Sequence, residues 1–286
     1  MSVTIAVIPA AGLGSRFLPA TKGIPKELLP LIDKPVIQYV IEEAVASNID
    51  HVVIITSPGK SSLEKYFQPD HDLELLLQKK GSFETLEKIK EVSSLVDISY
   101  VRQEKPLGLG HAVLLAKNLI GNQPFAVMLP DDIIQSEEPT LGDLIKLYGK
   151  YDSSIIGVEK IPLEKTLMYG VISPKPITKS IYKILELVEK PPSNKAPSDL
   201  GIVGRYILPS EIFEILQKTA PGSGGEIQLT DAIKTLLYTR DIYAYQFPGR
   251  RHDTGTPLGL LQASISIAIE HEYFGEHIIN TLRKLI

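Results

Sequence analysis

The chain has 286 residues, a formal net charge of −4 at pH 7 and 43% hydrophobic residues, which is the composition of an ordinary globular protein with a sizeable core. It contains no cysteine, so disulfides, thiolate zinc sites and a cysteine nucleophile are excluded. The slightly negative charge gives no general attraction to nucleic acid, so any phosphate ligand must be held by a local group of basic side chains.

The apolar runs of the sequence favour a cytoplasmic protein. Residues 1–9 lack a basic leader and read as a buried strand rather than a signal peptide. Charged residues, Pro or Gly interrupt every apolar run before it reaches the ~18 residues that a membrane span needs. We therefore expect no association with a membrane.

The first half of the chain alternates short apolar runs with helical patterns, which indicates an α/β fold with a mainly parallel sheet. The predicted buried strands are residues 4–8, 51–56, 98–102, 125–129 and 154–159. A helix is predicted over 36–46 and begins after Pro35, a position where the missing N–H of proline costs nothing.

From residue 161 the pattern changes to extended segments separated by stretches rich in Pro and Lys. The segments 181–188 and 200–208 are predicted to form a small antiparallel lobe, and 242–247 also reads as a strand. Helical patterns return at residues 210–218, 228–238, 258–270 and 274–285. The sequence has no internal repeat.

A turn of small residues follows the first strand, at the end where open α/β sheets place their ligands. Gly12 and Gly14 let the backbone approach an anion, and consecutive N–H groups there can surround phosphate oxygens. Arg16 and Lys26 supply positive charge nearby. The turn is no P-loop, and Phe17 stands where a dinucleotide fingerprint needs Gly. On this motif alone, a tight turn without a ligand stays an open alternative.

A series of further motifs follows in order along the chain. They are GLGSR at 12–16, PKELLP at 25–30, DKP at 33–35, VRQ at 101–103, GLGHA at 108–112, LPD at 129–131, YGV at 169–171, VEKP at 188–191, VGRY at 203–206, GEIQLTDA at 225–232 and HDTG at 252–255. Together they resemble the sugar-phosphate nucleotidyltransferase superfamily, and within it most closely the bacterial UTP–glucose-1-phosphate uridylyltransferases. The resemblance extends over nearly the whole chain.

The resemblance implies a single nucleotidyltransferase domain over residues 1–286, with a Rossmann-like mixed, mainly parallel sheet. Its nucleotide-binding half would span about 1–160, and its sugar-binding half, which includes the antiparallel lobe, about 161–256. The C-terminal helices at about 257–286 would make the contacts of a homodimer or homotetramer.

The implied activity is transfer of uridylyl from UTP to α-D-glucose-1-phosphate, with UDP-glucose and pyrophosphate as products and Mg²⁺ as cofactor. We expect in-line attack without a covalent intermediate, so catalysis consists of positioning and charge neutralisation. A phosphate monoester has a second pKa of about 6, so the attacking oxygen is largely ionised at pH 7 and no general base is needed. We therefore expect His111 to begin a helix rather than to act in catalysis.

The nucleotide is expected at the first turn and beside Gln103. The amide of Gln103 follows a predicted strand and offers a donor and an acceptor side by side, which suits a uracil edge. An ordinary surface glutamine is an equal alternative without the family pattern. The resemblance assigns Gln103 to the base together with backbone groups of Ala11 and Gly108. The full implied set is Ala10, Ala11, Gly12, Leu13, Gly14, Lys26, Glu27, Gln103, Pro106 and Gly108.

Two carboxylates are expected to bind the metal ion. Asp131 follows an apolar strand and places a hard oxygen ligand near the first turn, which suits Mg²⁺. The resemblance places Asp253 opposite it. Asp132 is expected to point away from Asp131 and to be a solvated turn residue.

The sugar phosphate is expected at the end of the segment 181–188. The acid Glu189 can bind sugar hydroxyls and Lys190 can reach the phosphate, although a solvated pair is the alternative. The implied sugar-phosphate set is Gly170, Glu189, Lys190, Val203, Gly204 and Glu226. The implied catalytic groups are the cations Arg16, Lys26 and Lys190, which offset the repulsion between the anionic substrates.

Two other functions stay open at this point. A glucose-1-phosphate thymidylyltransferase would share the glycine turn and the amide, and a non-catalytic nucleotide-binding regulatory subunit would share the fold. The sequence also departs from the family at Arg250 and Arg251, where Lys-Ser is more frequent. Because Arg and Lys are not interchangeable at a bidentate site, the role of these two residues is open.

Overall fold

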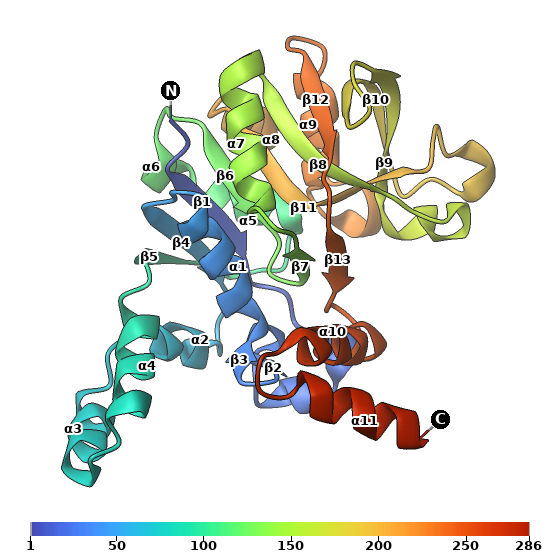
Figure 1. Ribbon diagram of the computed structural model, residues 1–286. Helices are drawn as coiled ribbons and strands as arrows, with labels where there is room; N and C mark the ends of the chain where they lie inside the picture. The colour runs from blue at the N-terminus through green and yellow to red at the C-terminus, as the bar shows by residue number, and fades with distance from the viewer. Residues whose placement is uncertain (1, 286) are drawn as a thin grey trace.

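The computed structural model describes residues 2–285 and is built on one nine-stranded sheet with helices on both faces (Figure 1). The strand order is β5-β4-β1-β6-β11-β8-β12-β10-β9. The strands are β1 (Ile5–Pro9), β4 (His51–Thr56), β5 (Asp97–Arg102), β6 (Phe125–Met128), β8 (Ser154–Lys160), β9 (Gly170–Pro176), β10 (Ile181–Glu189), β11 (Leu200–Leu208) and β12 (Ile242–Gln246).

The side chains of the sheet alternate between two apolar layers, as the period of a strand requires. In β1, Val7 packs into a cluster with α5, α8 and α9, whereas Ile8 packs into a cluster with α1, α2 and α7 on the other face. The helices are α1 (Val36–Ala46), α2 (Ser61–Tyr66), α3 (His71–Lys80), α4 (Phe83–Ser93), α5 (Leu109–Leu115), α6 (Lys117–Ile120), α7 (Thr140–Tyr151), α8 (Ile212–Lys218), α9 (Leu229–Leu236), α10 (Pro257–Glu270) and α11 (Gly275–Leu285).

The sheet is mixed, as expected. Strands β5, β4, β1 and β6 pair in parallel, so their carboxyl ends lie at one edge. Strand β11 is antiparallel to both β6 and β8, and β10 is antiparallel to β9 and β12. The expected antiparallel segments are therefore present, and they continue the main sheet instead of forming a sheet of their own.

Two short strand pairs lie outside the main sheet. Strand β2 (Pro30–Leu31) pairs with β3 (Lys34–Pro35), and β7 (Asp132–Gln135) pairs with β13 (Arg250–Asp253). Neither pair is recognisable in the sequence, because such short strands carry no period. The second pair matters for function, since it brings residues that are far apart in the sequence to the end of β6.

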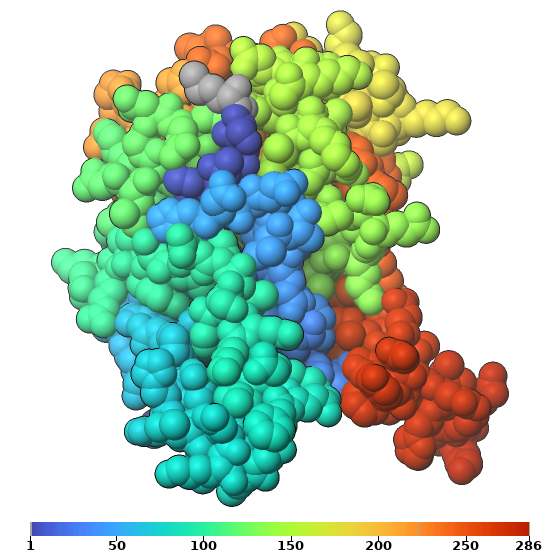
Figure 2. Space-filling view, turned by 60° about the vertical axis from the view of Figure 1, so that its left-hand side comes forward, coloured from blue at the N-terminus to red at the C-terminus, as the bar shows by residue number. Residues whose placement is uncertain are grey.

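Helices α3 and α4 form an arm at one end of the molecule, and α10 and α11 project beside it (Figures 1 and 2). The last two helices and the turn between them expose several large apolar side chains, namely Leu258, Leu261, Tyr273, Phe274 and Leu285. No helix within residues 2–285 combines the length and the apolar character that crossing a bilayer requires.

A buried ion pair joins α1 to β11. The side chain of Arg205 on β11 is 0% exposed, and its Nη2 lies 2.6 Å from Oε2 of Glu43 on α1. The same guanidinium donates to the carbonyl oxygens of Gly204 at 2.9 Å and Asp132 at 2.8 Å. Because the charges of the pair are out of water, each depends on the other.

We expect Arg205→Met to destabilise the protein by about 3–5 kcal/mol, because the carboxylate of Glu43 would stay buried without its cation. Urea unfolding followed by circular dichroism measures the change. Lys88→Ala is the matched control, since it breaks the exposed pair with Glu84 and should cost less than about 1 kcal/mol. Equal unfolding midpoints for the two variants would contradict the structural role given to Arg205.

Candidate active site

A cavity of about 290 Å³ lies at the edge where the parallel strands end. It is lined by Pro9, Ala11, Gly12, Lys26, Gln103, Pro106, Gly108, Leu109, Ala112, Leu129, Pro130, Asp131 and Glu226. Ala11, Gln103 and Asp131 follow β1, β5 and β6, whose parallel pairing brings the carboxyl ends of these strands together. The cavity thus joins most of the predicted nucleotide residues to one of the predicted metal ligands.

Ala11 and Gly12 of the glycine turn line this cavity, and the turn carries backbone donors that the protein does not use. Within residues 2–285, the N–H groups of 11–14 donate to no protein acceptor, whereas that of Ala10 donates to the carbonyl of Ile55. Gly14 has φ 65, a conformation that favours glycine, and its carbonyl accepts a 2.8 Å hydrogen bond from Thr21. A run of unused N–H groups at a turn is an anion-binding arrangement.

Lys26 and Asp131 form an ion pair at the cavity wall. Their Nζ and Oδ2 atoms are 2.5 Å apart, and the side chains are 20% and 30% exposed. Burial opposes the charged form of both groups, but their attraction prevails. It raises the pKa of Lys26 above its ordinary value and holds the pKa of Asp131 below its own. Both groups are therefore charged at neutral pH and can still be reached by a ligand.

Asp253 meets Asp131 beside Gly255. A Cβ atom added to Gly255 would lie 3.0 Å from Oδ2 of Asp131, 3.0 Å from Oδ1 of Asp253 and 3.6 Å from Nη1 of Arg16. Because both oxygens lie 3.0 Å from the same point, they are at most about 6 Å apart. The pairing of β13 with β7 brings Asp253 to this place, and a side chain at position 255 would press on both carboxylates.

The two converging carboxylates fit a hard divalent cation. No group of three or more His, Cys, Asp or Glu side chains in residues 2–285 is arranged to hold a metal ion. Mg²⁺ suits this limited set, because it usually takes one or two carboxylates and completes its shell with water and substrate phosphate. Asp131 and Asp253 are therefore the residues that would hold it.

Glu27 is placed differently from the other predicted nucleotide residues. Its side chain is 1% exposed and its Oε2 lies 2.8 Å from Nζ of Lys60, which also donates to the carbonyl of Ala10 at 2.6 Å. Burial raises the pKa of Glu27 and lowers that of Lys60. The carboxylate of Glu27 does not line the cavity. It pairs with Lys60, and Lys60 in turn fixes the carbonyl of Ala10 at the start of the glycine turn. Lys60 was not predicted, because nothing near it in the sequence indicates that its ammonium is buried.

The expectation that Asp132 is a solvated turn residue is wrong. Its side chain is buried, with Oδ2 2.9 Å from the amide of Gly204 and Oδ1 paired with Arg251. Burial raises the pKa of Asp132, and Arg251 opposes that rise. The reason for the error is the pairing of β7 with β13, which surrounds Asp132 with donors from distant parts of the chain.

Arg251 is occupied by protein groups. Besides Asp132 it donates to Glu159 at 2.6 Å and to the hydroxyl of Tyr169 at 2.6 Å. Its neighbour Arg250 donates to Ser266 at 3.1 Å. The buried guanidinium of Arg251 therefore joins β7, β8 and the residue before β9.

The predicted sugar-phosphate residues include Gly170 at the start of β9, Glu189 at the end of β10, and Val203 and Gly204 in the middle of β11. Glu189 pairs across the strands with Gly170, and a Cβ on that glycine would lie 3.2 Å from Oε2 of the acid. Lys190 is 48% exposed and its Nζ lies 3.2 Å from Glu189. Val203 is buried, so only its backbone can serve a ligand. Glu226 reaches the nucleotide cavity, which places the two groups of residues next to each other.

The amide of Gln103 is held by two neighbours. The side chain is 5% exposed, and its Nε2 lies 3.2 Å from the carbonyl of Gly108 and 2.8 Å from Nδ1 of His111. Gly108 has φ 101, and a Cβ there would lie 2.7 Å from Glu226. This loop is thus fixed against the segment that carries Glu226.

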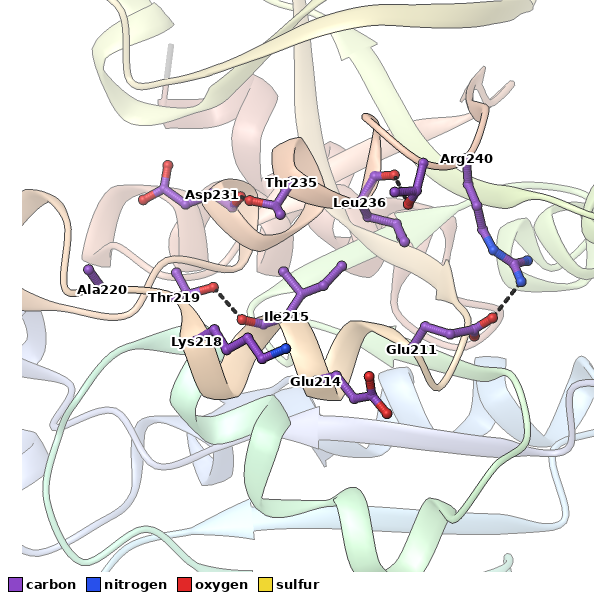
Figure 3. A pocket seen from close by; sticks show the side chains of 11 residues that line it. Glu211, Glu214, Ile215, Lys218, Thr219, Ala220, Asp231, Thr235, Leu236 and Arg240 are labelled. Atoms are coloured by element: carbon purple, nitrogen blue, oxygen red, sulfur yellow. Dashed lines mark hydrogen bonds and ion pairs between the residues drawn. The ribbon is translucent and has the colours of Figure 1, made fainter.

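A larger hollow of about 640 Å³ lies between α8 and α9 (Figure 3). Its wall includes Ile215, Leu236 and the ion pair of Glu211 with Arg240. None of the predicted site residues lines it. Its chemistry does not match the anionic ligands that the smaller cavity can hold, so volume is a poor guide to the site here.

Comparisons with known proteins agree with this arrangement. Residues 5–269 match the family described as Nucleotidyl transferase. The UTP–glucose-1-phosphate uridylyltransferase of Bacillus subtilis (strain 168) is 48% identical over 98% of this chain and 96% of its own length. The structure of a UTP-bound UGPase from Acinetobacter baumannii has a TM-score of 0.92 at 38% identity, covering 99% of this chain and 100% of that one. A putative glucose-1-phosphate thymidylyltransferase from Bacillus anthracis has a TM-score of 0.70 at 23% identity, covering 91% and 94%, and this likeness shows the fold alone.

Gly204 is the glycine whose replacement should damage the site most directly. An added Cβ would lie 2.5 Å from Cβ of Leu129 and 2.6 Å from Oδ2 of Asp132. We expect Gly204→Ala to cost about 1–3 kcal/mol of stability by overpacking. We also expect it to lower kcat/KM by about 10- to 100-fold through displacement of the carboxylates.

Gly149→Ala is the control for this substitution. Gly149 lies in α7 with nothing within 4 Å of an added Cβ, so alanine there should stabilise the protein by about 0.5–1 kcal/mol. Thermal unfolding and steady-state kinetics on both variants measure the two effects. Full activity of Gly204→Ala would show that Asp132 can move without consequence.

Proposed function

Since the chain belongs to the nucleotidyl transferase family and, within it, to the bacterial UTP–glucose-1-phosphate uridylyltransferases, we propose that it joins UTP and α-D-glucose-1-phosphate into UDP-glucose and pyrophosphate. The observation that carries the proposal is the single cavity where unused turn amides, the amide of Gln103 and the pair of Lys26 with Asp131 meet. These groups match, in that order, a triphosphate, a uracil ring and a cation-assisted phosphoryl centre.

The nucleotide is proposed to bind through residues 10–14 and 103–108. Its phosphates accept hydrogen bonds from the amides of 11–14, and its base lies beside Gln103. Lys26 is positioned to exchange the carboxylate of Asp131 for a phosphate oxygen, because the pair is partly exposed. Arg16, whose Nη1 lies 3.5 Å from the carbonyl of Gly255, adds charge at the same place.

The sugar phosphate is proposed to bind beside the start of β9, the end of β10 and the middle of β11. Glu189 accepts hydrogen bonds from sugar hydroxyls, and Lys190 leaves Glu189 to pair with the phosphate. Backbone groups at Gly170, Val203 and Gly204 approach the hexose. The attacking phosphate oxygen is already largely ionised at pH 7, so no residue has to remove a proton.

Nucleotidyl transferases in general use a divalent metal ion, and we propose Mg²⁺ for this chain. Asp131 and Asp253 are the residues that would hold it. When bound, the ion neutralises charge on phosphate oxygens. The protein contributes Lys26, Arg16 and Lys190, which orient the anions and reduce the repulsion between them.

The two other functions have less support. The likeness to a thymidylyltransferase reaches only the fold, whereas the uridylyltransferase relative shares nearly the whole chain at 48% identity. A regulatory subunit that only binds nucleotide has no need for both Asp131 and Asp253 next to the cations Lys26 and Arg16.

We also propose that the chain forms a homodimer or homotetramer through α10 and α11. Tyr273 and Leu285 are 80% and 77% exposed, and an apolar surface of this kind is usually covered. Light scattering that gives the mass of one chain would contradict this. A cytoplasmic location stays a prediction.

We expect purified protein to release pyrophosphate from UTP and glucose-1-phosphate. The release should stop when EDTA removes divalent ions and should resume when Mg²⁺ is added. With dTTP the release should be much slower. A preference for dTTP would move the chain to the thymidylyl reaction, and no release with either nucleotide would favour the regulatory subunit.

The mutational arm of this assay is Asp131→Asn. It keeps the shape of the side chain but removes its charge, so we expect a loss of kcat of at least about 100-fold at saturating Mg²⁺. The matched control is Asp241→Asn, which changes an acid that is 51% exposed and pairs with Lys183. It should keep the wild-type rate, and an equally active Asp131→Asn would overturn the assignment.

A further inference from the structure

Two neighbouring acceptors together set the orientation of the Gln103 amide. The carbonyl of Gly108, 3.2 Å from the amide nitrogen, can accept a hydrogen bond but cannot donate one. If the amide were turned over, its oxygen would face that carbonyl oxygen. The nitrogen of Gln103 therefore belongs at this position.

The second N–H of the amide points at His111. Nδ1 of His111 lies 2.8 Å from Nε2 of Gln103, and the amide nitrogen can only donate. Nδ1 must therefore accept, which makes His111 neutral with its proton on Nε2. Burial lowers the pKa of His111, in agreement with a neutral ring.

The remaining polar atom of the side chain, Oε1, is left for a ligand. It accepts no hydrogen bond from residues 2–285, yet it is not among the fully buried atoms that lack a partner. Because Gln103 lines the cavity, its oxygen opens into the space proposed for the base. The site therefore presents an acceptor, the amide oxygen of Gln103, to the base. A glutamine side chain without these neighbours could present either its oxygen or its nitrogen.

We propose that His111 determines the choice of base, by holding the amide of Gln103 so that its oxygen faces N3 of the pyrimidine. Uracil carries a hydrogen on N3 and donates it to this oxygen. Cytosine has an unprotonated N3, which is itself an acceptor, so two acceptors would face each other. The inference rests on the proposed function, and it concerns UTP against CTP, since thymine has the same N3–H as uracil.

The cost of the wrong base follows from hydrogen-bond energetics. An acceptor left without a donor in a site that excludes water lowers binding by about 10- to 100-fold. We expect the wild-type protein to show at least this preference for UTP over CTP in kcat/KM. His111 acts on the base only through Gln103, so it is a positioning residue.

Two variants of His111 separate its acceptor from its bulk. His111→Leu removes the shorter of the two contacts and leaves the amide held only by the 3.2 Å bond to Gly108, so we expect the turned-over amide to become populated and the UTP/CTP ratio of kcat/KM to fall by about tenfold or more. His111→Asn places an amide oxygen near the former Nδ1 and should keep most of the preference. A general loss of structure would lower the rates with both nucleotides together and leave the ratio unchanged.

Each outcome of the experiment decides the inference. An unchanged ratio in His111→Leu overturns it, as does a loss of preference in His111→Asn equal to that in His111→Leu. A ¹⁵N NMR spectrum of the wild-type protein is a second test that needs no variant. It should show His111 protonated on Nε2, and a proton on Nδ1 would overturn the inference.

Gln103→Leu distinguishes this inference from the proposed function. If the variant keeps the wild-type KM for UTP, the base lies elsewhere and the proposed nucleotide site fails. If Gln103→Leu raises that KM while His111→Leu leaves the UTP/CTP ratio unchanged, the site stands and only the role of His111 fails.

Discussion

The buried carboxylate of Asp132 is the group around which the site is built. A carboxylate out of water needs strong donors, and Asp132 finds them in the amide of Gly204 and the guanidinium of Arg251. Arg251 in turn reaches Glu159 and Tyr169, so one hydrogen-bonded network links β7, β8, β11 and β13 to the residue before β9. Because breaking a buried pair is costly, these strands keep a fixed relation to one another.

The neighbouring acid serves the opposite purpose. Asp131 is partly exposed and pairs with Lys26, which a ligand can reach. Two consecutive carboxylates thus have different roles. Asp132 fixes the backbone after β6, and Asp131 stays available to bind a cation. Asp132 lies between the nucleotide cavity and the predicted sugar-phosphate residues, so it can keep the two binding sites at a fixed distance from each other.

The sequence predicted the parts of this arrangement that depend on local patterns. The helix α1 and the strands β4 and β11 have the predicted bounds, since each buries a regular face. The cavity also gathers Gly12, Lys26, Gln103, Pro106, Gly108 and Asp131, because the parallel strands place their carboxyl ends together. The roles of these residues stay predictions.

What the sequence did not predict depends on contacts between distant segments. Asp132 and Arg251 are 119 positions apart, and the short pair β7–β13 that joins them has no local signature. Lys60 and His111 read as ordinary polar residues, since burial of an ammonium and the tautomer of an imidazole follow from the packing around them. Supporting groups of this kind are the hardest to read from a single sequence.

The most direct test of the account is a crystal structure of the protein with UTP and Mg²⁺. We expect the triphosphate on the amides of residues 11–14, the base with its N3 within hydrogen-bond distance of Oε1 of Gln103, and the cation between Asp131 and Asp253. A nucleotide bound in the hollow between α8 and α9, or phosphates away from the glycine turn, would contradict it.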